Sequence, residues 1–355
     1  MSDKMKTILA LSVIPQIIVV KLLARVPDFV AQYYSNGIYP LIAKACRYTL
    51  GWIPFSVGDI LYMLAGIFII RFFICNIRLL RRRPWFFFRE ILVVIAMLYF
   101  TFHLFWGMNY YRPPIHTTLG IGNTYSTGEL VDFTEKLITR TNTLQKEITG
   151  NDSLAVQLPY TRQDIYEMSV SGYARLATGY PGLSYTPPSI KSSLISLPLT
   201  YMGYSGYLNP FTNEAQVNSL RLDYRYPLIT CHEEAHQIGF SAENEANFVG
   251  YLAATAHDDP YFRFSGYAYM LRYCLNEVFR RDKDRFADLK AKIHPGILSN
   301  YEEVALFWST YENPAEPLFK NTFNAYLKAN NQADGIRTYS YVVALLVNYH
   351  KEHPL

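Results

Sequence analysis

The stretch Tyr226-Pro-Leu-Ile-Thr-Cys-His-Glu-Glu-Ala-His-Gln-Ile-Gly239 is the most informative part of this chain of 355 residues. Pro227 suits the first turn of a helix and Gly239 suits its C-terminal stop, so the stretch predicts a helix over about 225–238. His232 and His236 are four residues apart, which places both imidazoles on one face of that helix. Apolar residues on its other side predict that the helix is half-buried.

Two imidazoles in this arrangement can chelate one metal ion, and Zn²⁺ favours nitrogen ligands of this kind. Glu233 follows His232 directly and lies about 100° around the helix, from where it can reach a zinc-bound water. It can accept the proton of that water, whose pKa the metal lowers, and return the proton to the leaving amine. The pattern therefore predicts a Zn²⁺ site with His232 and His236 as ligands and Glu233 as the catalytic base.

A catalytic zinc takes a third protein ligand, and the segment after Gly239 offers two carboxylates. If the chain reverses at Gly239, a helix that begins near Glu243 passes back over the metal. Glu243 and Glu245 would lie about 200° apart on that helix, so only one of them can face the ion. Glu243 shares its face with Asn247, whose amide can orient a ligand by hydrogen bonding. Glu243 is therefore the favoured third ligand, with Glu245 as the alternative.

The first 110 residues are strongly apolar. The whole chain is 50% hydrophobic and only 17% charged, where soluble domains have about a quarter of charged residues. Three stretches, at about 7–26, 60–77 and 91–108, approach the ~20 residues that cross a bilayer as a helix. The segment 27–58 is too polar to span and rich in aromatic residues, which predicts that it lies at the membrane interface.

Arginines between the second and third apolar stretches predict the orientation in the membrane. They are Arg78, Arg81, Arg82, Arg83 and Arg89. Positive residues favour the cytoplasmic side, so this link and the N-terminus should both be cytoplasmic. Three spans then place the rest of the chain outside. We expect a multi-pass protein of the inner membrane, with a membrane domain at 1–109 and an extracytoplasmic, periplasmic domain at 110–355.

The second domain has the pattern of an α+β fold that is mostly helical. Residues 189–196 alternate between apolar and polar and predict a strand, and residues 206–219 predict a strand or a hairpin. Apolar residues at helical spacing predict the remaining elements. The helices are expected at about 127–148, 162–178, 225–238, 243–257, 262–281, 301–311, 317–330 and 336–350. The fold class is therefore α+β, with an N-terminal bundle of three transmembrane helices and a small sheet in the second domain.

The metal motif resembles that of the gluzincin group of zinc peptidases, in which HExxH is followed on a later helix by the Glu of an ExxxD or ExxAD motif. The resemblance implies His232 and His236 as ligands and Glu233 as the base. It also implies Glu243 as the third ligand and places Asn247 where the group has Asp. The gap between His236 and Glu243 is much shorter than is usual in gluzincins.

Two other patterns bear on the family. The metzincin pattern HExxHxxGxxH matches through Gly239, but Ala242 occupies the position of its third His, which argues against that group. Over nearly its full length the chain resembles an uncharacterised, domain-of-unknown-function family of Bacteroidota membrane proteins. The stretches that carry this resemblance are IPFSVGD at 53–59, NPFT at 209–212, HEEAHQIGF at 232–240, EANF at 245–248 and DPYFRFSGY at 259–267. It supports a zincin-like fold without an established substrate.

A zincin-like fold implies a place for the substrate as well. Such sites bind an extended chain along a sheet edge before the motif helix, and the stretch from Asn209 to Asn218 is the candidate for that edge, with a plain surface hairpin as the alternative. Its first residues, Asn209, Pro210, Phe211 and Thr212, are the candidate substrate-binding residues. A tetrahedral intermediate also needs a donor for its oxyanion. Tyr339 is a candidate for this role, and Arg337 is a second one.

We therefore expect a membrane-anchored zinc-dependent hydrolase, in the first place a metallopeptidase whose peptide or protein substrate can be membrane-associated. One alternative is an amidase acting on a cell-wall or lipid-linked substrate. Another is a catalytically silent metal-binding scaffold, although that role would not need Glu233. Charged flanks such as Asp223 and Arg225 exclude a motif inside a membrane span. The net charge of +4 and the lack of a basic run in the C-terminal two thirds argue against nucleic-acid binding.

Overall fold

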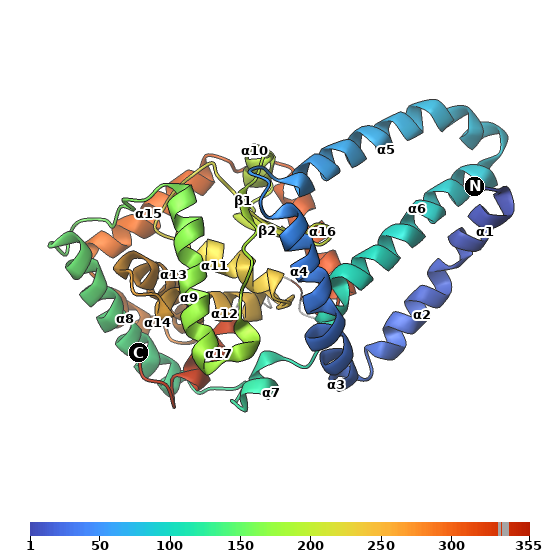
Figure 1. Cartoon of the computed structure of the whole chain (residues 1–355). Coiled ribbons are helices and arrows are strands. Elements are labelled where there is room, and N and C mark those ends of the chain that lie inside the picture. The colour runs from blue at the N-terminus through green and yellow to red at the C-terminus, as the bar shows by residue number, and fades with distance from the viewer. Residues whose placement is uncertain (333–334, 336–340) are drawn as a thin grey trace.

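The computed structural model describes residues 1–332, 335 and 341–355. Figure 1 shows a long helical arm that projects from a mostly helical domain, with a short helical segment between them. The domain carries a small sheet of three strands. The expected apolar helices near the N-terminus and the mostly helical fold with a small sheet are confirmed at this level.

The arm contains three helices that are long and apolar enough to cross a membrane. The first, Asp3–Leu23, is divided at Ser12 into α1 (Asp3–Leu11) and α2 (Val13–Leu23). The other two are α5 (Val57–Arg82) and α6 (Pro84–Phe105). Large apolar side chains along α5 are exposed, for example Phe68 at 73%. Such a surface suits a lipid environment and not water.

The N-terminus and the link between α5 and α6 lie together at the far end of the arm (Figure 1). Arg89 binds Asp3 at 2.7 Å, and Lys6 binds Glu90 at 2.8 Å. These ion pairs join α1 to the start of α6. The basic link and the N-terminus are therefore on the same side, opposite the domain.

The segment expected at the membrane interface is helical and connects the arm to the domain. It consists of α3 (Pro27–Phe29), the π-helical η1 (Val30–Ile38) and α4 (Tyr39–Leu50). Its Tyr48 and Trp52 are 68% and 77% exposed. After α6 the chain enters the domain through η2 (Gly107–Tyr111) and α7 (Ile115–Leu119).

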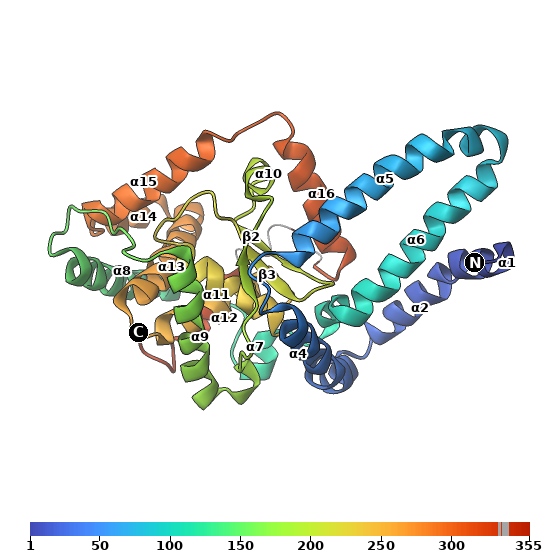
Figure 2. The ribbon, with the colours of Figure 1, turned by 45° about the horizontal axis from the view of Figure 1, so that its top comes forward.

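The centre of the domain is formed by α11 (Tyr226–Gln237) and α12 (Glu243–Ala256), which pack against each other. Figure 2 shows them with the sheet on one side and with α8, α9 and α13 on the other. Most side chains of both helices are buried. The surrounding elements are α8 (Thr127–Thr149), α9 (Arg162–Gly179), η3 (Pro181–Leu183), α10 (Ser196–Tyr201), α13 (Pro260–Arg281), α14 (Lys283–Ala291), α15 (Pro295–Ser309), α16 (Glu316–Ala329) and α17 (Val342–Tyr349).

The sheet consists of β1 (Ile190–Ser192), β2 (Gly206–Asn209) and β3 (Glu214–Val217), in the order β1-β3-β2. β1 is parallel to β3, and β2 is antiparallel to it. The predicted strand and hairpin are therefore both present. β2 is an edge strand, and β3 packs on the metal helix α11.

Candidate metal centre

Helix α11 begins and ends as its sequence predicts. Pro227 lies in its first turn, and Gly239 adopts a φ of +101°, which an L side chain rarely adopts. The amide of Phe240 then donates to the carbonyl of Ala235 at 3.1 Å, which closes the end of the helix. A Cβ at position 239 would also lie 3.1 Å from the Tyr39 ring. Glycine is therefore required at this turn for two reasons.

The chain reverses after Gly239, and α12 returns along α11. The two helices approach each other closely at Gly250, where a Cβ would lie 2.9 Å from the backbone nitrogen of His232. This close approach brings the first turn of α12 over the imidazoles of α11. Glu243 is the first residue of that turn.

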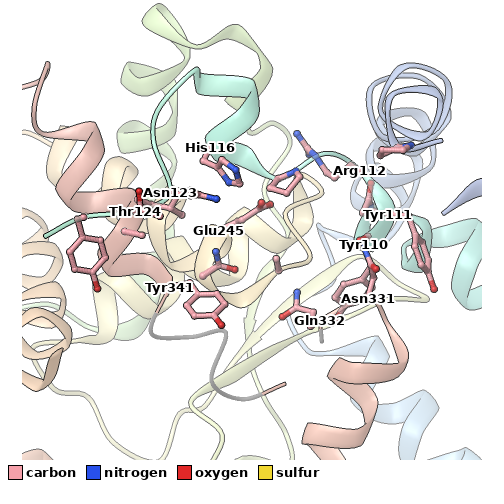
Figure 3. A pocket seen from close by; sticks show the side chains of 18 of the residues that line it. Tyr110, Tyr111, Arg112, His116, Asn123, Thr124, Glu245, Asn331, Gln332 and Tyr341 are labelled. Atoms are coloured by element: carbon pink, nitrogen blue, oxygen red, sulfur yellow. Dashed lines mark hydrogen bonds between the residues drawn. The ribbon is translucent and has the colours of Figure 1, made fainter. Parts of the chain in front are cut away.

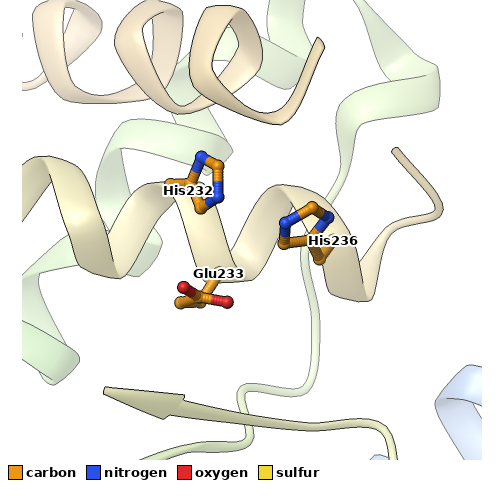
Figure 4. A group of neighbouring side chains, drawn as sticks. All are labelled: His232, Glu233 and His236. Atoms are coloured by element: carbon orange, nitrogen blue, oxygen red, sulfur yellow. The ribbon is translucent and has the colours of Figure 1, made fainter. Parts of the chain in front are cut away.

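Three side-chain atoms converge between these helices. Glu243 Oε2 lies 3.3 Å from His232 Nε2 and 3.6 Å from His236 Nε2. Two ligands bound tetrahedrally at 2.0–2.2 Å from a zinc ion are about 3.4 Å apart, so this donor set fits Zn²⁺. Figure 4 shows the two imidazoles on one side of α11, with Glu233 below them. The nearest ligand atoms of His232, Glu233 and His236 lie within 4.8 Å of one another.

The rival carboxylate, Glu245, has a different partner. Its Oε1 accepts a hydrogen bond from the backbone of Ile115 at 2.7 Å. Glu245 lines a cavity of about 980 Å³ beside the first turn of α12, together with Arg112 and His116 (Figure 3). Of the two carboxylates considered from the sequence, the structure therefore places Glu243 with the imidazoles.

Hydrogen bonds from the second ring nitrogen orient a ligand imidazole. His236 Nδ1 lies 2.6 Å from the carbonyl of Phe240, which can only accept, so Nδ1 carries the proton and the Nε2 lone pair is left for a metal. Asn247 lies beside His232 and raises its pKa slightly against the larger, lowering effect of burial. His232 Nδ1 and Asn247 Nδ2 nevertheless have no hydrogen-bond partner of normal geometry within the described part of the chain.

In the absence of a metal, the imidazole of His236 holds a proton at the place where a metal cation would bind. Burial disfavours a charged imidazolium at His236, but the carboxylates of Glu243 and Glu233 outweigh it and raise the pKa of His236 to about 9. Burial opposes the charge of Glu243, yet the two imidazoles hold its pKa well below its usual range. The pKa of His232 is lowered, mainly by burial. The site therefore combines one neutral imidazole, one charged imidazole and a carboxylate.

Glu233 lies on the side of α11 that faces the sheet. A Cβ at Gly206, the first residue of β2, would lie 2.5 Å from Glu233 Oε1, so only glycine fits there. Glu233 Oε2 is buried without a hydrogen-bond partner among the described residues. Burial raises the pKa of Glu233 to about 8. Without a metal the carboxyl of Glu233 is therefore mostly protonated near neutral pH, whereas a cation bound by the imidazoles would favour its ionised form, in which Oε2 is placed to accept a proton from a bound water.

Tyrosines surround Glu243 from other elements. The charge of Glu243 raises the pKa of Tyr110, Tyr204 and Tyr326, in each case after the larger effect of burial. The Tyr110 hydroxyl donates to that of Tyr326 at 3.3 Å. These hydroxyls are candidate oxyanion donors that sequence patterns could not select among 30 tyrosines. The predicted Tyr339 and its alternative Arg337 lie outside the described residues.

The segment Asn209–Thr212 forms the turn between β2 and β3. Asn209 Oδ1 accepts hydrogen bonds from the amides of Phe211 and Thr212 at 3.0 and 3.2 Å, with Pro210 between them in the chain. The turn faces the start of α5, where a Cβ at Gly58 would lie 2.5 Å from Asn209 Nδ2. A direct contact of these four residues with substrate stays a prediction. The residue of this hairpin that reaches Glu233 is Gly206.

The end of α11 is held by residues from the arm side of the molecule. Tyr39 of α4 donates to the carbonyl of Gln237 at 2.8 Å, and Trp106, which follows α6, donates to that of His236 at 3.2 Å. Arg47 of α4 donates to the same Gln237 carbonyl at 3.4 Å. These donors satisfy carbonyls that every helix end leaves without an intrahelical partner.

One known protein family matches the chain over a range that contains both the apolar helices α5 and α6 and the regions of the metal motif. The model of a family described as "Protein of unknown function (DUF3810)" matches residues 34–347. The chain belongs to the DUF3810 family. The matched range begins within η1 and includes α4, α5, α6, the sheet and α11–α12. Comparisons of this DUF3810 chain with curated proteins and with solved structures gave no match.

Proposed function

We propose that this chain is a membrane-anchored zinc hydrolase and, more specifically, a metallopeptidase with a zincin-like site. One observation carries the proposal. His232 Nε2, His236 Nε2 and Glu243 Oε2 converge at 3.3 and 3.6 Å, with the carboxylate of Glu233 beside them. Three protein ligands with an open position are typical of catalytic zinc sites, whereas structural sites use four.

A bound Zn²⁺ would act as a Lewis acid that lowers the pKa of a water molecule. His232, His236 and Glu243 would hold the ion, and the hydrogen bond from His236 Nδ1 to Phe240 fixes that ring. Glu233 takes the proton from the water and hands it to the leaving nitrogen. The Tyr326 hydroxyl, which accepts from Tyr110, keeps its own proton and can donate it to the oxyanion.

Metal content tests the ligand set. We expect one zinc per chain in the purified wild type and in Glu245→Gln, and less than a tenth of that in His232→Ala and Glu243→Gln. Glu245→Gln is the matched control because Glu245 lies in the same helical turn and is buried to a similar degree. Equal zinc in Glu243→Gln and the wild type would remove Glu243 from the site.

Turnover tests the chemistry. Glu233→Gln should keep its zinc and lose hydrolysis of a quenched fluorescent peptide library by 100-fold or more, within the range of general-base effects of about 10²–10⁴. Unchanged turnover in this variant would rule out Glu233 as the base. A zinc-loaded wild type that cleaves no peptide would leave the metal site standing and exclude the peptidase assignment.

We also propose that α1–α2, α5 and α6 cross the inner membrane, with the basic link cytoplasmic and the domain periplasmic. Two observations support this. The N-terminus and the link are paired at one end of the arm through Arg89–Asp3 and Lys6–Glu90, and the domain lies at the opposite end. Alkaline phosphatase, which folds only in the periplasm, should be active when fused after Leu355 and inactive when inserted after Arg83. The reverse result would invert the topology.

A further inference from the structure

The candidate metal centre adjoins the end of a predicted membrane span. α6 ends at Phe105, and the next residue, Trp106, donates to the backbone of the ligand His236 at 3.2 Å. The Trp106 and His236 rings are 6.1 Å apart, edge to face. The centre is therefore within one side chain of the point where α6 leaves the arm.

The edge strand β2 leads from this centre to the start of another span. Gly206 lies at Glu233, and Asn209, three residues later, lies against Gly58 in the first turn of α5. The hydroxyl of Tyr207 also donates to Asp59 in that turn. At about 3.3 Å per residue, this path covers about 10 Å. Both spans that border the strand have these ends on the domain side of the arm (Figure 1).

The outer edge of β2 has unpaired backbone groups. The carbonyl of Ser205 accepts a hydrogen bond from Asn218, and that of Asn209 accepts one from Asn213, so these two residues face β3. Backbone groups in an antiparallel pair alternate in direction, so those of Gly206 and Leu208 point away from β3. Within the described residues, no strand pairs with β2 on that side.

We propose that the substrate is the juxtamembrane segment of a membrane-anchored polypeptide, which pairs as an added strand with Gly206 and Leu208. This rests on the proposed peptidase function. A chain lying along β2 reaches the span ends within about 10 Å of Glu233, so the cleaved bond lies three to six residues from the membrane-spanning part of the substrate. An extended main chain is the partner that matches alternating N–H and C=O groups of a strand edge, which disfavours a lipid amide.

The reaction is a hydrolysis and needs only water as co-reactant. The water oxygen bonds to the peptide carbonyl carbon, and the C–N bond breaks. Glu233 transfers the water proton to the departing nitrogen. The products are a carboxylate on one fragment and an amine on the other, one of which stays in the membrane.

The position of cleavage tests the inference. Zinc-loaded wild type and Glu233→Gln are reconstituted in phosphatidylethanolamine–phosphatidylglycerol vesicles with a library of polypeptides, each with twelve randomised residues joined directly to one Leu/Ala span. The span stands at either end of the random segment. Two further libraries carry a twenty-residue Gly/Ser spacer or no span, and mass spectrometry reads the new termini.

We expect the directly anchored library to be cut at least tenfold faster than the library without a span, at bonds three to six residues from the span. Cuts spread evenly, or equal rates with the unanchored library, would overturn the juxtamembrane substrate and leave the peptidase intact. If zinc-loaded wild type cuts none of the libraries, the peptidase function itself fails.

A pair of variants tests the strand pairing. Leu208→Pro and Leu208→Ala both remove the leucine side chain, but only proline also removes the outward N–H, and an edge strand tolerates it there. Leu208→Pro should cleave the anchored library at least tenfold more slowly than Leu208→Ala, with equal zinc content. Equal rates would exclude pairing at this edge. Unequal zinc would show damage to the site itself and would also count against the assignment.

Discussion

The two ends of α11 are held by different parts of the molecule. Along the N-terminal half, the domain's own helices provide the partners: the Tyr173 hydroxyl donates to the carbonyl of Cys231 at 2.5 Å, and the Leu228 amide donates to Ser265 at 3.0 Å. At the C-terminal end, Tyr39 and Trp106 come from the arm side. The candidate metal centre is therefore assembled where the domain meets the apolar arm.

The two histidines proposed as ligands therefore lie in different surroundings. His232 lies in the half of α11 that is enclosed by α9, α12 and α13, whereas the backbone of His236 is held by Trp106. Removing the partners of the N-terminal half of α11 should lower the stability of the fold. Removing the partners of its C-terminal end should weaken metal binding as well.

The largest effect is expected from deleting the arm side. A fragment of residues 110–355 lacks Tyr39, Arg47 and Trp106, and it exposes Leu208, which packs in an apolar cluster with Tyr39 and Trp106. We expect this fragment to bind less than a tenth of stoichiometric zinc and to aggregate. Zinc analysis and size-exclusion chromatography against the full chain in detergent measure both. A monomeric fragment with full zinc would show that the domain builds the centre alone.

A smaller effect is expected from separating α11 and α12. Gly250→Ala places a Cβ 2.9 Å from the His232 nitrogen, a contact with backbone that cannot move away easily. Overpacking of this kind costs about 1–3 kcal/mol of stability, and it should also weaken zinc binding by moving Glu243 away from the imidazoles. Gly128→Ala is the control, because the nearest atom to its new Cβ is 3.9 Å away. Equal zinc affinities in the two variants would contradict this account.

Two hydroxyl deletions compare the ends of the helix directly. Tyr173→Phe and Tyr39→Phe each leave a buried carbonyl of α11 without one donor, which costs about 1–3 kcal/mol of unfolding free energy. Only Tyr39→Phe should also lower zinc affinity, by about tenfold, as expected for a partner that orients a ligand. Thermal unfolding and competition with a zinc chelator provide the two readouts. A lower zinc affinity in Tyr173→Phe than in the wild type would contradict the prediction that only the C-terminal end of α11 supports metal binding.

The smallest effect concerns pH. The pKa of His236 is raised from its ordinary 6.5 to about 9, so the metal-free protein gains stability from this group below pH 6.5 and loses it as the pH rises through about 9. Zinc must displace that proton, so zinc affinity should rise by up to tenfold per pH unit over the same window. The zinc-induced increase in Tm should therefore be larger at pH 8.5 than at pH 6.5. In His236→Ala, zinc should not raise the Tm at either pH. A smaller increase at pH 8.5 would contradict the assignment.

The metal helix could be predicted closely because its signals are local. Its limits were predicted to within one or two residues from Pro227, the histidine spacing and Gly239. The chain reversal expected at Gly239 also brings Glu243 back over the imidazoles. Hydropathy also located the three apolar helices. It missed the break at Ser12, since the helix resumes there after a single residue.

The surroundings of the metal helix could not be predicted, because they depend on contacts distant in sequence. Gly206 gives no sign in the sequence that it lies against Glu233, and Trp106 belongs to a stretch that hydropathy assigns to the membrane alone. Helix α14 was also missed, because its charged sequence lacks a strong apolar stripe. Only the folded structure brings the helix that ends at Gln237 together with the tyrosines around Glu243.

The first turn of α5 is fixed to the sheet by polar contacts. Glu214 of β3 accepts hydrogen bonds from the amides of Val57 and Gly58 at 3.2 and 2.6 Å, and Asp59 accepts from Leu194 at 2.7 Å. The apolar stretch of α5, at about 60–77, is about 27 Å long and close to the ~30 Å of a hydrocarbon core, so a membrane-spanning α5 would tilt to different degrees in bilayers of different thickness. Because its first turn is attached to the strands, a change in tilt moves the hairpin relative to Glu233. Under the proposed function, bilayer thickness would therefore affect the position of the proposed substrate-binding edge as well as the environment of α5.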